Sequence, residues 1–192
     1  MCNIQYNIEF FSNWHCGSGL AAGADVDALV VKDADGLPYV PGRTLKGLLR
    51  EAAYELNQYA RENHSSLLDD IFGISGDQPI TESNAARTGS AFFGNATLAE
   101  GKAIVTNRLV SYLFQTFAST AIDENSGIAK DNSLRKTETV VPCILKGDIK
   151  NVPEQGVTLL EKAMQMVKRM GTGRNRGYGR CCISIITKEE SK

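Results

Sequence analysis

The segment 36–53, GLPYVPGRTLKGLLREAA, marks the point at which an extended chain turns into a helix. Pro41 and Gly42 end the extended part, and the pattern predicts a helix that starts near Arg43. The apolar side chains that follow recur with the 3.6-residue period of a helix that buries one face. These side chains are Leu45, Leu48, Leu49, Ala52, Ala53, Leu56 and Tyr59.

The same helix start carries a stripe of cations. Arg43, Lys46 and Arg50 are spaced three and four residues apart, so they share one face of the helix. The free N–H groups and the positive dipole end of the first turn lie beside Arg43, Thr44 and Lys46, and this combination predicts an anion site. The alternative is an ordinary helix start with a few exposed cations.

The residues before this helix predict strands and turns. Apolar and polar residues alternate over 4–10, which is the pattern of a strand with one buried face. Segment 12–25 is rich in glycine and alanine and is expected to be a loop. Segment 28–32, ALVVK, is expected to be a second strand, and Asp35 with Gly36 suits the tight turn of a hairpin.

Beyond the helix, loops, strands and helices alternate. We expect, in chain order, a polar loop at 64–88, a strand at 90–100, a short helix at 108–118, a polar arm at 119–136, extended chain at 137–152, a helix at 157–170 and a strand at 181–187. The arm is poor in aromatic residues, so it is either a disordered tip or ordered only by a partner. This order predicts an α+β fold of ferredoxin-like type, with one domain over residues 1–192.

The segment 170–180, MGTGRNRGYGR, places four glycines and three arginines in eleven positions. It lacks the GK[ST] of a phosphate-binding P-loop, and it connects a helix to a strand, which is the reverse of a dinucleotide-binding loop. Exposed backbone N–H groups flanked by Arg174, Arg176 and Arg180 are suited to phosphates. Tyr178 could stack on a base. The alternative is a flexible connection with solvated arginines.

Composition limits the other function classes. The formal net charge is −1, so a nucleic-acid surface must be local and not spread over the whole chain. Five cysteines without a CxxC pair, and only two histidines, argue against a disulfide framework and a structural zinc site. No apolar run approaches the roughly 20 residues that span a bilayer. The N-terminus does not have the pattern of a signal peptide, so we expect a cytoplasmic protein without membrane partners.

Four segments in this order resemble the RAMP superfamily of CRISPR effector proteins, and most closely the backbone subunits of type III complexes. They are WHCGSG after the first strand, VKDADGLPYVPGRTLKGLLREA, FFGNATL, and the C-terminal GTGRNRGYGR. Either basic segment alone would be a weak signal. The pair at this spacing is fairly specific and spans most of the chain.

The resemblance implies an RRM-like (ferredoxin-like) core and copies that stack along a CRISPR RNA and hold its backbone. It also implies a thumb-like insertion at 119–141 that intrudes between guide and target RNA. Partners would then be the CRISPR RNA, target RNA, further copies of the chain and other effector subunits. The RNA-binding residues would be Gly42, Arg43, Thr44, Lys46, Arg50, Arg174, Arg176 and Tyr178.

Related subunits use an aspartate in the loop after the first strand to help cleave target RNA with a divalent metal. Here the expected position holds Gly19 and Leu20, and the acids come later, at Asp25 and Asp27. Asp25 is the first catalytic candidate and Asp27 the second. Mg²⁺ would be held by a carboxylate, RNA oxygens and water. The alternatives are a purely structural pair of aspartates and a subunit that binds RNA without cutting it.

His15 has two readings. Histidine is the general acid or base in metal-independent RNases that process guide precursors and share the glycine-rich loop, but those enzymes usually carry two ferredoxin-like units. Next to Trp14, His15 is better explained as a packed or RNA-stacking residue. A small-molecule phosphate binder is the remaining class, and the absence of a P-loop, a dinucleotide motif and a catalytic triad argues against it.

Overall fold

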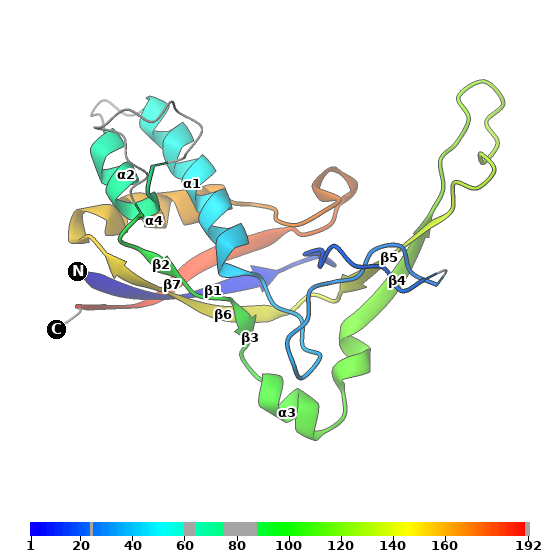
Figure 1. Cartoon of the computed structure of the whole chain (residues 1–192), viewed down its shortest axis with the longest axis horizontal. Helices are drawn as coiled ribbons and strands as arrows, with labels where there is room; N and C mark the ends of the chain where they lie inside the picture. Colours follow the sequence, from blue (N-terminus) through cyan, green and yellow to red (C-terminus); the bar gives the residue numbers. More distant parts are fainter. Residues whose placement is uncertain (24, 60–63, 75–87, 191–192) are drawn as a thin grey trace.

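The computed structural model describes residues 1–23, 25–59, 64–74 and 88–190. Figure 1 shows a sheet with helices above it and a long hairpin that projects to one side. The main sheet contains β2 (Phe92–Phe93), β6 (Ile144–Val152), β1 (Cys2–Phe10) and β7 (Cys181–Glu190) in that order, and β3 (Thr97–Leu98) also pairs with β6. All of these pairs are antiparallel.

The helices lie in chain order between the strands. They are α1 (Gly42–Tyr59), α2 (Ser65–Phe72), α3 (Gly101–Thr106) and α4 (Glu154–Met166), with 3₁₀ turns η1 (Val110–Leu113) and η2 (Arg174–Arg176). Taking β2 and β3 as one position, the order β-α-β-β-α-β around an antiparallel sheet is ferredoxin-like. The expected α+β, ferredoxin-like class is therefore confirmed.

The core lies between one face of the sheet and the helices. Ile4, Tyr6 and Ile8 of β1 are fully buried on that face, and α1 packs against α4 above them. The opposite face is polar, because the register places Gln5 beside Asp148 and Asn7 beside Lys146. This alternation is what a sheet covered on one side requires.

The arm is a two-stranded hairpin of β4 (Phe114–Ser119) and β5 (Arg135–Val140), which forms a separate sheet. The short helix expected at 108–118 is therefore wrong: only Val110–Leu113 forms a 3₁₀ turn, and the chain then becomes β4. The reason is pairing with a distant partner, since Phe117 lies opposite Thr137 in the register. The arm is thus a hydrogen-bonded hairpin and not a disordered tip (Figure 1).

Four further expectations need correction. Segment 28–32 forms only isolated bridges, such as Val30 with Gly17, and the Val30 N–H donates to the Glu138 carboxylate, so no continuous strand results. The loop expected at 64–88 contains helix α2, while residues 75–87 lie outside the described part. Helix α4 ends at Met166, because the following residues pair with the chain entering β7. The strand expected at 90–100 is split into β2 and β3.

All five cysteines are free thiols in the structure. In the part of the chain that the structure describes, none of the helices has the length and apolar character needed to cross a membrane.

Candidate nucleic-acid interface

The glycine loop (residues 171–179) is closed at its base by main-chain hydrogen bonds. Met170 N–H donates to the Gly179 carbonyl at 3.0 Å, and Cys181 N–H donates to the Lys168 carbonyl at 2.9 Å. Gly171, Gly173, Gly177 and Gly179 all have positive φ angles, which side chains with a Cβ rarely adopt. The loop is therefore a defined turn between α4 and β7.

The glycines of this loop have different structural roles. A Cβ at Gly171 would overlap the His15 carbonyl, and a Cβ at Gly179 would overlap the Met170 carbonyl. Gly177 has nothing within 4 Å of the position of a Cβ and faces open space. Two glycines thus permit packing against the protein's own backbone, and Gly177 leaves backbone accessible to a ligand.

The cations of the loop are exposed. Arg174 and Arg176 lie in η2 at the outer end of the loop, and the Arg169 guanidinium donates to the Arg174 carbonyl at 2.9 Å. The loop borders an open hollow of about 580 Å³ that runs from Gly171 to Arg176. Positive side chains around an open, side-chain-poor backbone can hold phosphates without a metal ion.

The structure joins the loop to the root of the arm. Arg176 lines the open hollow of the loop, a second hollow of about 380 Å³ along Ser119 and Arg135, and a smaller cavity beside Phe117. Phe117 and Tyr178 meet edge to face, with ring centroids 5.7 Å apart. Two segments that were predicted separately therefore form one surface around Arg176.

His15 makes hydrogen bonds to both parts of this surface. Its side chain is buried, with 4% exposed, and the ring Nδ1 lies 2.6 Å from the Glu138 carbonyl of β5, to which Nδ1–H donates. Its own carbonyl accepts a hydrogen bond from Thr172 N–H at 2.9 Å. His15 is therefore a packed residue that links the arm to the glycine loop, and it also lines the small cavity.

The start of α1 lies in a different environment. The Gly42 N–H, which was expected to be free, donates to the Asn95 side chain at 2.9 Å, and a Cβ at Gly42 would overlap the Phe93 carbonyl. Gly42 is thus explained by packing against the turn after β2. Arg43 is exposed, and the Arg50 guanidinium lies 5.5 Å from the ring centre of Tyr54. The cations around Arg43 remain a predicted second contact.

The two aspartates of the first loop differ in their contacts. Asp27 is held to the arm: its N–H donates to the Lys136 carbonyl at 2.9 Å, and its carboxylate accepts the Lys136 N–H at 2.7 Å. Asp25 is exposed, and its N–H donates to the Ala22 carbonyl. Among the described residues, no three His, Cys, Asp or Glu side chains gather where they could hold a metal ion. Both aspartates are exposed, but without a third protein ligand among the described residues they do not form a protein-built Mg²⁺ site.

Sequence reasoning missed the contribution of the arm strands. Phe117, Thr137 and Arg135 face the glycine loop, yet none was a candidate. The available signal was the alternation in FQTFAS and RKTETV, two short stretches of strand character that flank a polar turn. A hairpin prediction alone would still not have placed the arm beside the glycine loop, because the sequence does not show where the hairpin packs on the domain.

Many solved structures have a similar fold, among them two chains of type III-B Cmr-beta complexes. A chain of a type III-B Cmr-beta complex bound to cognate target RNA aligns with a TM-score of 0.70 at 9% identity, covering 95% of this chain and 96% of that chain. A chain of the type III-B Cmr-beta complex in its apo state aligns with a TM-score of 0.72 at 11% identity, covering 96% and 97%. At these identities the likeness shows the fold alone.

No curated protein matches the chain. The model of the RAMP superfamily matches residues 7–182, which runs from the first strand into the last and includes the glycine loop and the arm. Because this match covers most of its length, the chain belongs to the RAMP superfamily.

Proposed function

We propose that the chain is a guide-RNA-binding backbone subunit of a type III-like CRISPR effector complex, in which several copies stack along the guide. The observation that carries the proposal is the surface around Arg176, a residue that lines three hollows along the glycine loop and the arm root. The similarity in fold to chains of type III-B complexes, one of them bound to target RNA, supports the same assignment.

In this proposal the guide phosphates lie on the glycine loop, with Arg174 and Arg176 as the main cations. Arg43, Thr44, Lys46 and Arg50 at the start of α1 form a second backbone contact. The hairpin arm, expected at 119–141, acts as the thumb between guide and target RNA. Further copies and other effector subunits are partners, and the cytoplasmic location expected from the sequence belongs to the same proposal.

The test is RNA binding by the double variant Arg174→Ala, Arg176→Ala. We expect a large loss of affinity at physiological salt, and a plot of log affinity against log salt that is shallower by roughly 0.7 for each phosphate contact removed on a single strand. The matched control is Lys102→Ala, which removes an exposed cation from α3, below the sheet and away from the loop in Figure 1. Unchanged affinity in the double variant would remove the loop from the interface.

A second candidate function is cleavage of target RNA, and the exposed carboxylate of Asp25 favours it. The described residues do not build a metal site there by themselves. The assembled complex, with Mg²⁺ or Mn²⁺ added, tests the idea directly. Cleavage that is lost in Asp25→Asn, with binding retained, supports it; cleavage that is never seen, or that survives in this variant, contradicts it.

A further inference from the structure

A small cavity lies between the arm root and the glycine loop, and it differs in character from the open hollows beside it. Its volume is about 200 Å³, and it is lined on one side by Phe117, Thr137 and Thr139 of the arm and on the other by Tyr178 and Arg176 of the loop, with His15 between them. A dry cavity of about 150 Å³ is enough to hold a benzene ring. This cavity therefore has the size for one flat heterocycle and is too small for a drug-sized ligand.

The cavity has an aromatic wall that is fixed before any ligand binds. A Cβ at Gly173 would come within 2.6 Å of the Tyr178 ring, so the ring packs directly on the glycine backbone. The Phe117 ring meets Tyr178 at an interplanar angle of 63°. Contacts with Gly173 and Phe117 thus limit the rotation of the Tyr178 ring, which lowers the entropic cost of stacking a second ring upon it.

The same cavity offers polar groups at its edge. The Thr139 hydroxyl donates to the Gln115 carbonyl and accepts from the Asn13 side chain, so its position is fixed. The His15 Nδ1–H is bound to the Glu138 carbonyl, and in that tautomer Nε2 is a hydrogen-bond acceptor. This Nε2 lies against Gly17, where a Cβ would come within 3.1 Å of it, so the Thr139 hydroxyl is the fixed polar group of the cavity lining. An aromatic wall with a few fixed polar groups is the form in which proteins hold a single unstacked base.

We propose that this cavity binds one unpaired nucleobase of a single-stranded RNA, which stacks on Tyr178 while its phosphates lie beside Arg176. The proposal rests on the proposed function, since it requires an RNA strand on the glycine loop. The position of Arg176 supports this path for the strand, because Arg176 borders the cavity and also the two hollows beside it. A strand could enter along the loop, place one base in the cavity and leave along Ser119 and Arg135.

Binding of two oligomers of equal length and charge to the full chain tests the proposal. One is a uridine 12-mer, and the other is a 12-mer of the same backbone without bases. Base-to-aromatic stacking contributes enough for an alanine-type truncation to weaken binding about tenfold. We expect Tyr178→Leu to weaken uridine binding by about that factor and to leave binding of the base-free oligomer unchanged. The matched control, Tyr112→Leu, removes an exposed ring from η1 and should change neither affinity.

The outcomes separate the two proposals. If the wild-type chain binds both oligomers equally well, or if Tyr178→Leu weakens both by the same factor, the base cavity is wrong and the phosphate interface stands. If neither oligomer binds, the proposed function fails as well. Phe117→Leu is a second variant at a ring that is already 40% exposed, so its folding is secure, and it should reproduce the selective loss.

Photocrosslinking locates the base independently of affinity. A 12-mer of 4-thiouridine should crosslink to Tyr178 or Phe117, and peptide mapping by mass spectrometry should find the adduct within segments 114–119 or 174–180. Crosslinks confined to other segments would overturn the assignment of the cavity.

Discussion

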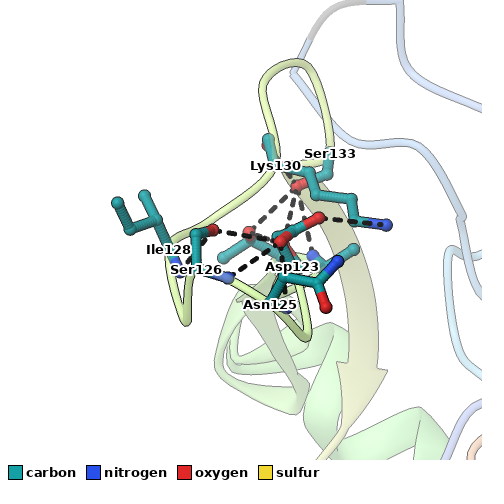
Figure 2. A network of polar contacts seen from close by, with 8 residues as sticks. Asp123, Asn125, Ser126, Ile128, Lys130 and Ser133 are labelled. Carbon is teal, nitrogen blue, oxygen red and sulfur yellow. Dashed lines mark hydrogen bonds and ion pairs between the residues drawn. The ribbon is translucent and has the colours of Figure 1, made fainter.

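The domain core and the arm of this chain are stabilised in opposite ways. The core buries apolar side chains between the sheet and the helices, with Ile4, Ile8 and Leu160 fully excluded from solvent. Beyond its root, where Thr139 and Val140 of β5 are buried, the arm has little to bury: of β4, only Phe114 is partly covered, and Ile128 near the tip is 68% exposed. What replaces burial in the arm is a set of local hydrogen bonds (Figure 2).

The hydrogen bonds of the arm tip centre on two side chains. The Asp123 carboxylate accepts the N–H groups of Asn125 and Ser126 and the Ser126 hydroxyl, at 3.0 to 3.1 Å. Ser133 donates its hydroxyl to the Lys130 carbonyl at 2.6 Å and accepts the Ala121 N–H at 3.1 Å. Such a tip holds its shape without a core, but its stability is local, so it can open while the domain stays folded.

The largest expected effect on stability comes from replacing a leucine by alanine in the core, compared with the same replacement in the arm. Leu49 on α1 is 0% exposed, whereas Leu134 at the end of the arm is 59% exposed. Leu49→Ala should lower the free energy of unfolding by about 2–5 kcal/mol, because it leaves a cavity in the core. Leu134→Ala should change it by no more than about 0.5 kcal/mol. Urea denaturation measures both, and similar losses would show that the arm is part of the cooperative core.

A smaller effect is expected from two glycines with similar backbone angles. Gly179 in the glycine loop and Gly127 at the arm tip have φ of 68° and 66°. Forcing a Cβ into this region costs about 1–2 kcal/mol at either site. At Gly179 the Cβ also overlaps the Met170 carbonyl, while at Gly127 the space is open.

Gly179→Ala should therefore lower the melting temperature of the whole domain, and Gly127→Ala should leave it unchanged, because the strain relaxes by opening of the tip alone. Calorimetry gives the melting temperatures, and hydrogen exchange of the tip amides shows the local opening. Equal melting temperatures for the two variants would contradict the idea that the loop belongs to the core and the tip does not.

The same division explains how much of the fold the sequence could predict. β1, α1, α4 and β7 were found because the core selects apolar residues with period two or 3.6, and these periods are visible locally. Strand β4 was missed at 108–118 because it buries almost nothing, so its composition carries no strong period. Segment 28–32 misled for the reverse reason: Val30 is apolar and buried, yet it forms only an isolated bridge with Gly17, and its N–H donates to the Glu138 side chain.

The candidate site shows the same limit. Arg174, Arg176 and Tyr178 were found from residue chemistry, because glycine and arginine together are unusual. The cavity beside Tyr178 could not be predicted, since it requires Phe117 and Thr137 to lie opposite each other in the hairpin. It also requires the hairpin to dock beside the loop, which His15 brings about through its bonds to both.

The smallest expected effect concerns the acid response of the arm tip. Hydrogen bonds from the backbone and hydroxyl of Ser126, and from the backbone of Asn125, hold the pKa of Asp123 below its ordinary value. A carboxyl whose pKa is lower when folded stabilises the fold at pH values above its unfolded pKa of about 3.9. That stabilisation is lost as pH falls through the lower, folded value. The tip should therefore be closed at pH 7 and loosen only in acid.

Amide resonances of Asn125 and Ser126 report this transition, because both amides donate to the Asp123 carboxylate. We expect them to titrate with a midpoint below about 3.9, while resonances of β1 stay unchanged over the same range. Asp123→Asn should abolish the titration and loosen the tip at pH 7, and Asp131→Asn, at an exposed position of the same arm, should do neither. A midpoint at or above the ordinary pKa of an aspartate would mean that the hydrogen bonds to Asp123 do not hold the tip. A simultaneous change in the β1 resonances would mean that the tip and the core unfold together.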